Sequence, residues 1–422
     1  MSLQFIIGGS GSGKTRTLYE NLIRQSMEEP DGRFFALVPE QFTMQTQKEI
    51  VMLHPNHGVM NIDIVSFARL GHRIFEEMGQ PFSHILEDTG KRMVIRKVLE
   101  EKRRQLGVFS GSVRKSGFSG ELKSMISELL QYNISPQMLT DCLNRMGENG
   151  VLPGKLKDLS LIYEGFKDYI EGHYLTAEEI LDKLCPLIPA SKIIKNSWIY
   201  LDNFTGFTPS QYHLLAELLT YSKGVQMTLT VDVDEHPYEL KNNYELFYLT
   251  KETLYRLEKL CGEIHCERMD DILLKTNGAK TYGLMGGRRY TKGNPDGQFT
   301  KENPDGHEGR FGKRMDLIHL EKNIYRKRGR AYDAEPEHLK LYMAKNPGNE
   351  ADFVARRIRR LVRDEGYRYR EIAVITGDVS GYRHMIEKSF KAMDIPCFID
   401  MKRSILNNAF VECLRAMLEM FS

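Results

Sequence analysis

The sequence predicts an α/β protein: a parallel sheet with a helical insertion, followed by the start of a second α/β domain. Near the N-terminus, short apolar runs alternate with amphipathic helical patterns, which is typical of a parallel sheet covered on both faces. Between residues 85 and 189 the patterns are helical and strand-like runs are absent. The alternation resumes after a segment rich in turn-forming residues. At 422 residues the chain is long enough for about three domains.

The amino-acid composition and net charge exclude several classes of protein. Hydrophobic residues make up 41% and charged residues 27%, as in an ordinary globular chain. The formal net charge of +2 excludes a strongly basic protein, so contact with nucleic acid would have to come from local patches. Neither a signal-peptide pattern nor an apolar run long enough to span a membrane is present, and six cysteines are too few for a disulfide scaffold. We therefore expect a protein of the reducing cytoplasm without membrane contact.

The first predicted domain is discontinuous and comprises residues 1–84 and 190–275. Its first part contains three strands that are each followed by a helix. These pairs are 3–7 with 16–27, 34–38 with 41–52, and 59–66 with 67–78. Its second part has strands at 197–202 and 225–231 and helices at 209–220 and 246–261, with Thr208 as an N-cap.

The strongest motif follows the first strand at once. It is a full match to GxxxxGK(S/T) and consists of Gly8, Gly9, Ser10, Gly11, Ser12, Gly13, Lys14 and Thr15. Glycines let backbone amides wrap a phosphate chain, and the positive end of the next helix points at the same anion. Lys14 would then reach the β- and γ-phosphates and the Thr15 hydroxyl would ligate Mg²⁺, so the motif predicts an ATP site.

A nucleotide site of this kind also needs an acidic residue at the end of another strand. Asp202 follows the apolar run 198–201, and we expect it to hold Mg²⁺ through water. The long separation between Lys14 and Asp202 fits the predicted insertion, residues 85–189. Its helices are expected at 90–104, 119–132, 136–145 and 156–171.

Asn203 occupies the position where helicase-type ATPases carry a glutamate that acts as general base. An amide cannot accept a proton near neutral pH, so we expect nucleotide binding with weak hydrolysis. The alternatives are a self-contained P-loop ATPase or small-molecule kinase, and a structural subunit with a vestigial loop. No catalytic residue is assigned.

Gln41, in the turn after the second predicted strand, is a weaker candidate for contact with nucleotide or single-stranded DNA, because ligands bind at the carboxyl edge of open parallel sheets. The alternative for Gln41 is an ordinary turn. Arginines at 356, 357, 359, 360 and 363 lie on one predicted helix, where a solvated face is the simpler interpretation and phosphate contact the alternative. Cys261 and Cys266 lack the spacing of a zinc site.

Residues 276–336 are predicted to form a linker, because 286–312 are rich in Gly, Pro and Asn. Residues 337–422 are predicted to form a second α/β domain that is incomplete. Its strands are expected at 338–344, 371–376 and 396–400, and its helices at 349–365, 381–393 and 409–421.

Several segments together resemble the B subunit of bacterial AddAB-type (RexAB-type) ATP-dependent helicase–nucleases. Besides the glycine loop, they are 37–43 (LVPEQFT), 65–70 (VSFARL), 200–209 (YLDNFTGFTP), 346–351 (NPGNEA) and 395–400 (IPCFID). The resemblance covers nearly the whole chain apart from the loop near 286–312. The glycine loop alone is shared by many NTPases, whereas this combination in this order is far more specific.

The resemblance implies two RecA-like domains of the helicase superfamily 1 type with helical insertions. It further implies a heterodimer with an A subunit that is the motor, contact with double- and single-stranded DNA, and the processing of double-strand DNA ends for homologous recombination. In that family the B subunit scans DNA for a hotspot sequence. Its nuclease domain and 4Fe-4S cluster lie in a C-terminal region beyond this sequence, so none of the six cysteines is assigned to the cluster. The sequence is thus expected to be the N-terminal part of such a subunit.

Overall fold

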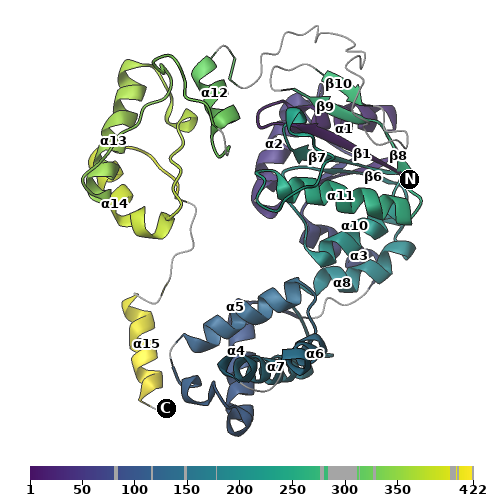
Figure 1. The fold of residues 1–422 in the computed structure, drawn as a ribbon, viewed down its shortest axis with the longest axis vertical. Coiled ribbons are helices and arrows are strands. Elements are labelled where there is room, and N and C mark those ends of the chain that lie inside the picture. Colours follow the sequence, from purple (N-terminus) through teal and green to yellow (C-terminus); the bar gives the residue numbers. More distant parts are fainter. Residues whose placement is uncertain are drawn as a thin grey trace. The chain divides into compact units, whose positions relative to one another are not determined.

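The computed structural model describes most of the chain, which forms two compact units, Met1–Arg330 and Ala331–Ser422 (Figure 1). The described residues are 1–79, 84–115, 117–146, 150–176, 178–275, 280–283, 311–312, 314–326, 329–399, 405 and 408–420.

The first unit is built on one sheet. Among its described residues, the strands lie in the order β10-β9-β1-β7-β6-β2-β3, and β8 also pairs with β1. Their bounds are β1 (Ser2–Gly8), β2 (Arg33–Leu37), β3 (Ile62–Val65), β6 (Ser197–Leu201), β7 (Gly224–Thr230), β8 (Glu267–Arg268), β9 (Asp271–Leu274) and β10 (Lys280–Gly283). Every pairing is parallel except that of β10 with β9. The prediction of an α/β protein with a mostly parallel sheet is therefore confirmed.

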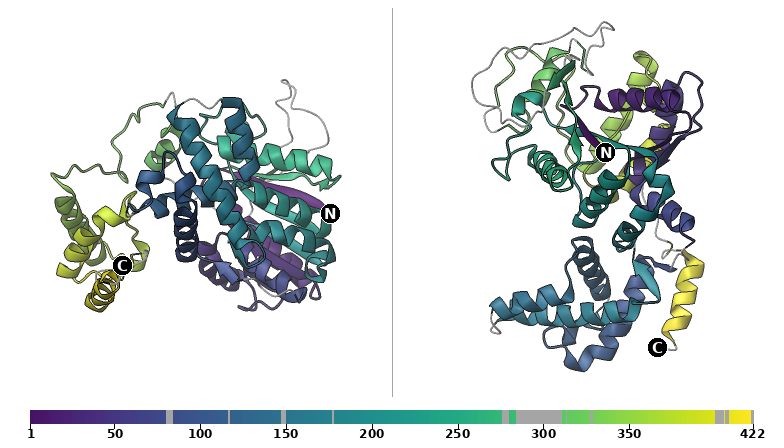
Figure 2. Two further views of the ribbon diagram at one scale, coloured as in Figure 1. Left: turned by 90° about the horizontal axis from the view of Figure 1, so that it is seen from below. Right: turned by 90° about the vertical axis from the view of Figure 1, so that its right-hand side faces the viewer.

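Helices cover both faces of this sheet (Figure 2). Alternate residues of β1 enter different cores: Phe5 and Ile7 belong to one apolar cluster and Ile6 to the other, as the two-residue period of a strand requires. The helices of the Ile6 side are α1 (Lys14–Glu28) and α2 (Thr43–Leu53). Those of the opposite side include α3 (Phe67–Glu77), α8 (Ile180–Leu184), α10 (Pro209–Tyr221) and α11 (Tyr248–Glu263).

Local sequence explains where several of these helices begin. Ser66 caps α3 by accepting a hydrogen bond from the amide of Arg69. Thr208 caps α10 in a reciprocal arrangement with Gln211, as predicted for Thr208, and Pro209 occupies the first helical position, where no backbone N–H is needed. Earlier in the chain, the short segments η4 (Cys185–Ala190) and α9 (Lys192–Lys195) connect α8 to β6.

A helical region with its own core lies between α3 and α8 in the sequence. Its helices are α4 (Asp88–Lys102), α5 (Phe118–Gln131), α6 (Pro136–Met146) and α7 (Val151–Ile170). Ile95, Ile126, Ile162 and Phe166 are fully buried in that core. The prediction that strands are absent here is wrong, because β4 (His84–Leu86) pairs in parallel with β5 (Tyr174–Thr176). Three-residue strands leave too short a pattern to recognise in a sequence.

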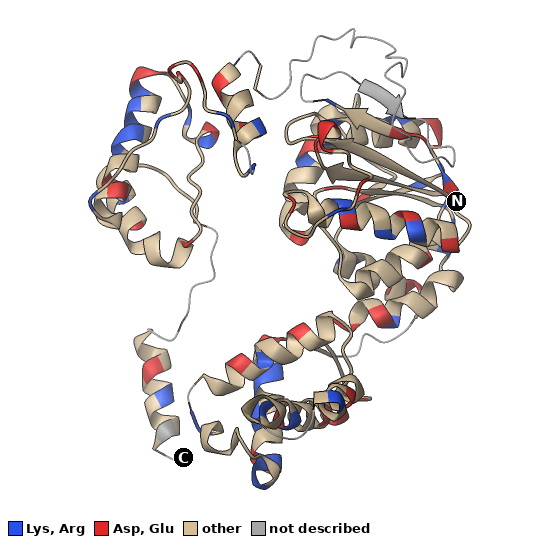
Figure 3. Cartoon of the chain, viewed as in Figure 1, with Lys and Arg blue, Asp and Glu red and all other residues tan. Residues whose placement is uncertain are grey.

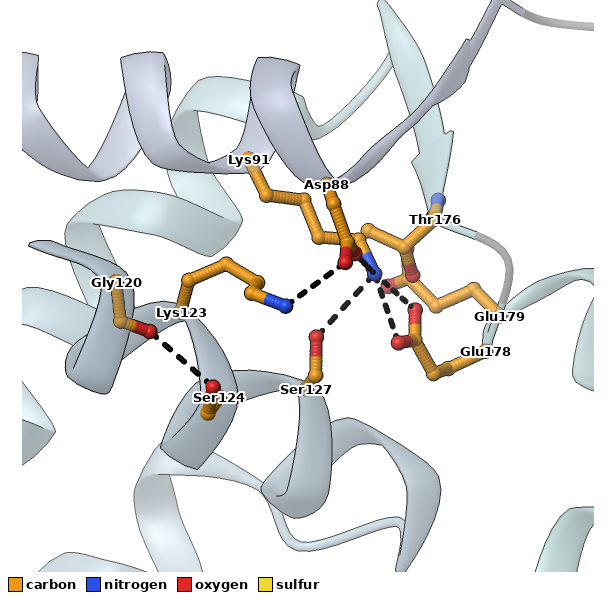
Figure 4. A network of polar contacts seen from close by, with 9 residues as sticks. All are labelled: Asp88, Lys91, Gly120, Lys123, Ser124, Ser127, Thr176, Glu178 and Glu179. Atoms are coloured by element: carbon orange, nitrogen blue, oxygen red, sulfur yellow. Dashed lines mark hydrogen bonds and ion pairs between the residues drawn. The ribbon is translucent and has the colours of Figure 1, made fainter. Parts of the chain in front are cut away.

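Buried charges hold the ends of this helical region together (Figure 4). Lys91 of α4 is 3% exposed, and its Nζ lies 2.7 and 2.8 Å from the two carboxylate oxygens of Glu178. The same Nζ donates to Ser127 Oγ of α5 at 3.3 Å. Next to Glu178, Glu179 accepts hydrogen bonds from Lys167 and from Thr176. The network ties α4, α5, α7 and the segment before α8 to one another.

The segment predicted as a linker contains two elements that its composition does not indicate. They are β10, which extends the sheet, and α12 (Met315–Asn323). Most of the Gly/Pro/Asn-rich stretch, residues 284–310, lies outside the described residues.

The second unit contains α13 (Pro347–Asp364), α14 (Val379–Ala392) and α15 (Ala409–Glu419), close to the three predicted helices. Ala355, Ile358, Phe390 and Ile395 form its small core. None of the described residues in 338–344, 371–376 and 396–399 forms a strand, so these three strand predictions are wrong there. Asp400, the last residue of the third predicted strand, lies outside the described residues. A strand needs a hydrogen-bonded neighbour, and these apolar runs are instead exposed, as at Leu341 (99%) and Ile375 (93%).

Candidate functional site

The predicted glycine loop connects β1 to α1 in a tight, strained path. Gly11 and Gly13 have φ angles of 77° and 92°, a region that side chains with a Cβ rarely adopt. At the end of β1, a Cβ on Gly8 would clash with Ser12 Oγ and would lie 2.7 Å from the carbonyl oxygen of Leu274. The loop therefore depends on glycine for its backbone angles at two positions and for close packing at a third.

The first turn of α1 has the features of a helix end that favours anions. The first four N–H groups of a helix have no intrahelical acceptor, and the cap residue Gly13 supplies none from a side chain. The first turn itself contains no acidic residue that would offset the positive end of the helix dipole. Lys14 is 9% exposed, and its Nζ donates to the carbonyl oxygen of Gly9 at 2.8 Å. The cationic group is therefore held against the loop.

Asp202 follows β6 directly and is 2% exposed. Thr15 Oγ1, from the first turn of α1, donates to its Oδ1 at 3.2 Å, and Thr228 Oγ1, from β7, donates to the same oxygen at 2.5 Å. Tyr19 OH and Asn203 Nδ2 each donate to Oδ2 at 3.1 Å. Four side-chain donors thus surround this carboxylate, and one of them belongs to the first turn of the glycine-loop helix.

The order of the strands in the sheet explains why the glycine loop and Asp202 lie close together. In the sheet, β7 lies between β1 and β6, and all three run parallel. The loop after β1 and Asp202 after β6 therefore lie at the same carboxyl edge. Thr228 bridges the gap from the strand between them.

The surroundings of Tyr19 keep its phenol protonated. Burial first, and then the negative charge of Asp202, raise the pKa of the Tyr19 phenol far above its ordinary value. The phenol is therefore a hydrogen-bond donor at any physiological pH. Its oxygen also lies 3.1 Å from Thr46 Oγ1 of α2, so the contact links α1, α2 and the end of β6.

Asn203 has an unusual backbone. Its φ of 64° lies in the left-handed region, which asparagine tolerates better than most residues with a side chain. In this conformation the side-chain amide of Asn203 turns back towards Asp202. The position expected to hold a general base is thus occupied by a hydrogen-bond donor that orients the carboxylate.

A cavity of about 1030 Å³ opens where these groups meet. Of the predicted site residues, it is lined by Ser10, Gly11, Gly13, Lys14, Thr15, Gln41 and Asp202. The loop residues Gly8, Gly9 and Ser12 do not line the cavity and are buried. Gln41 lies on the short turn η1 (Glu40–Phe42) on the α2 side of the cavity.

Sequence reasoning missed three residues of this site. They are Tyr19, Thr46 and Thr228, and all three also line the cavity. Each is an ordinary residue in an amphipathic helix or an apolar strand, so no motif marks it. Only the strand order, with β7 between β1 and β6, would have pointed to Thr228.

Other candidate chemistry is not assembled in the described part of the chain. No group of three or more His, Cys, Asp or Glu side chains there is arranged to hold a metal ion. Cys261 is buried, and its thiol donates to the carbonyl oxygen of Cys266 at 3.1 Å. Within the same described residues, no helix combines the length and the apolar character that crossing a bilayer requires.

Comparisons with known proteins place the chain in a family. The family model described as ADDB, N-terminal, matches residues 5–283. Proteins named as the B subunit of an ATP-dependent helicase/deoxyribonuclease are similar over nearly the whole chain: the one from Lachnoclostridium phytofermentans is 41% identical over 99% of it, and that from Geobacillus kaustophilus is 33% identical over 99%. The protein of the same name from Clostridioides difficile is 31% identical over 100% of the chain.

The chain spans 34% of the length of each of these relatives. The family match covers the glycine loop, the helical region and Asp202, which are the parts that build the candidate site. This chain belongs to the AddB N-terminal family.

Proposed function

We propose that the first unit is a P-loop, RecA-like domain that binds ATP with Mg²⁺ in the cavity beside α1. The observation that carries this proposal is the 3.2 Å hydrogen bond between Thr15 and Asp202. It brings a hydroxyl from the glycine-loop helix to a buried carboxylate at the same sheet edge. The open helix end and Lys14 lie beside the same cavity and complement a phosphate chain.

The donor set suits magnesium. Mg²⁺ prefers oxygen ligands, keeps several waters and needs only one or two carboxylates besides phosphate oxygens. Thr15 would ligate the ion directly, and Asp202 would hold it through water. Bound there, the ion would neutralise part of the charge of the phosphates.

Hydrolysis by this chain is proposed to be weak. A general base must accept a proton from the attacking water, and the amide of Asn203 cannot do so. Its Nδ2 is also engaged with Asp202 Oδ2. The chain would then hold nucleotide without acting as a motor.

The larger role follows from the family. The relatives are named as subunits of an ATP-dependent helicase/deoxyribonuclease. We propose that the protein works with an A subunit as a heterodimer, in the cytoplasm, on double- and single-stranded DNA. Its task would be to process double-strand DNA ends for homologous recombination and to recognise a hotspot sequence, with this chain as the N-terminal, helicase-like part.

Measuring phosphate release by the purified chain, with and without single-stranded DNA, tests the proposal. We expect ATP·Mg²⁺ to bind and turnover to stay low in both conditions. Rapid turnover stimulated by DNA would contradict the role assigned to Asn203. ATP consumption that requires a small-molecule acceptor would instead indicate a kinase.

A further inference from the structure

Helix α13 of the second unit has one face that is fully used in packing. Ala351, Ala355 and Ile358 are at most 5% exposed, and Ala355 and Ile358 pack with Phe390 of α14 and with Ile395 after it. The opposite face is the one that carries the arginines. Figure 3 shows the basic residues following one another along α13.

The acidic residues near the start of α13 accept hydrogen bonds from α14. Glu350 accepts a hydrogen bond from the hydroxyl of Tyr382, and Asp352 accepts one from Ser389; both donors belong to α14. Both carboxylates are therefore engaged with α14, although Asp352 stands four positions before Arg356 and so shares its side of the helix.

Two arginines of the exposed face form no close ion pair, although the charge of Arg360, after the hydrogen bond and charge of Arg363, helps to lower the pKa of Asp364. Among the described residues, no carboxylate lies within 4.0 Å of Arg356 or Arg360, whereas Arg357 pairs with Glu365 at 3.0 Å and Arg363 with Asp364 at 2.6 Å. Arg359 donates instead to the hydroxyl of Tyr369 at 2.9 Å. Arg356, Arg359, Arg360 and Arg363 are all exposed.

The spacing of these arginines destabilises α13. Residues 356, 359, 360 and 363 are three or four positions apart, and like charges at those spacings destabilise a helix. The dipole of the helix favours cations only in its last turn, which does not account for Arg356 or Arg359. Every basic residue of α13 is arginine rather than lysine. The planar guanidinium matches phosphate oxygens in a two-pronged geometry that lysine cannot provide.

We propose that the face of α13 formed by Arg356, Arg359, Arg360 and Arg363 binds the phosphate backbone of DNA. The inference rests on the proposed role in DNA-end processing and names a contact surface for that substrate. With a rise of about 1.5 Å per residue, Arg356 and Arg360 stand about 6 Å apart along the helix axis. Both guanidinium groups can therefore reach phosphates of the same DNA strand. Recognition of this kind does not depend on base sequence.

The test measures the affinity of the full 422-residue chain for fluorescent DNA by anisotropy, as a function of salt concentration. Duplex and single-stranded oligonucleotides of two unrelated sequences are used. The variant R356Q/R360Q should bind about tenfold more weakly in low salt, to the same extent for both sequences. The slope of log affinity against log salt should fall by about 1.8 for duplex or about 1.4 for single strands, which tells the two sources of phosphate apart. The variant R356K/R360K should recover only part of the lost affinity, because it keeps the charge but not the two-pronged geometry.

A matched control variant removes two positive charges at exposed positions outside α13. In K259Q/R415Q both residues are exposed, and each has a carboxylate partner, Glu263 at 3.8 Å and Glu412 at 3.4 Å. This variant should bind DNA like the wild type. If the wild-type chain binds DNA and R356Q/R360Q keeps its affinity and salt slope, the proposed surface is wrong while the proposed function stands. A wild-type chain that binds no DNA overturns both. Glutamine is a good helix former, so the circular dichroism spectrum of the variant should match that of the wild type.

Discussion

At the scale of single residues, the site is organised around the carboxylate of Asp202. Its Oδ1 accepts from Thr15 and Thr228, and its Oδ2 accepts from Tyr19 and Asn203. A buried carboxylate is costly unless donors surround it, and here four do. The predicted partners Thr15 and Asp202 came from sequence motifs. The other donors could not be found that way, because hydroxyl groups in helices and strands are common and only the folded sheet brings these together.

The left-handed backbone of Asn203 leads to a stability prediction. Replacing Asn203 by alanine or by glycine removes the same hydrogen bond to Asp202, but only glycine adopts a φ of 64° without strain. We expect N203A to be less stable than N203G by about 1 kcal/mol. Unfolding in urea, followed by the fluorescence of Trp198, the single tryptophan of the chain, reports on the sheet next to this position. Equal stability of the two variants would contradict the left-handed conformation.

At the scale of elements, the helical region depends on Lys91. This ammonium is 3% exposed and bonds to Glu178 and Ser127. The variant K91A should lose about 3 kcal/mol, because it leaves a largely buried carboxylate without its partner. Hydrogen exchange of peptides from α4 and α5 measures the effect. Lys97 on the same helix is 53% exposed and 3.9 Å from Glu101, so K97A should change exchange little. Similar losses in both variants would show that burial of Lys91 is unimportant.

The same region should lose stability in acid. Burial acts to raise the pKa of Glu179, but the hydrogen bond and charge of Lys167 and the bonds from Thr176 outweigh it and lower that pKa below the ordinary 4.5. A carboxyl whose pKa is lowered on folding stabilises the protein above its unfolded pKa, and that contribution is lost as the pH falls through the folded value. The stability advantage of the wild type over E179Q should therefore shrink below pH 4.5. Thermal unfolding across a pH series checks this, and an advantage that is constant with pH would refute it.

Elements were predicted well where the local pattern determines them. The apolar runs at 3–7, 34–38, 197–202 and 225–231 all became strands because each is long, continuous and ended by turn residues. Strand β8, which has only two residues, and strand β9, which has four, were missed. What holds β9 to β1 is a tertiary contact, in which the fully buried Asp271 accepts hydrogen bonds from the amide of Phe5 and from Arg268. The local sequence contains no pattern that predicts such a contact.

At the scale of the whole molecule, the two units differ in how completely their apolar segments are paired. In the first unit, β1, β6 and β7 have parallel neighbours on both sides, and helices on both faces of the sheet bury most of their side chains. In the second unit, the runs predicted as strands have the right composition, yet side chains such as Met343 and Phe398 remain 99% and 89% exposed. Composition predicts that a segment can enter a sheet, but pairing depends on neighbouring strands.

The central claim is that the cavity beside α1 binds ATP with Mg²⁺, and calorimetric titration of the chain with ATP tests it most directly. We predict that binding requires Mg²⁺ for full affinity and that D202N loses this dependence. In K14A the affinity should fall about 10- to 100-fold, as expected for the loss of a charge-assisted hydrogen bond. The control K48A removes an exposed lysine of α2 that does not line the cavity and should bind ATP like the wild type. Equal affinity of K14A and wild type, or no binding by the wild type, would contradict the assignment of this site.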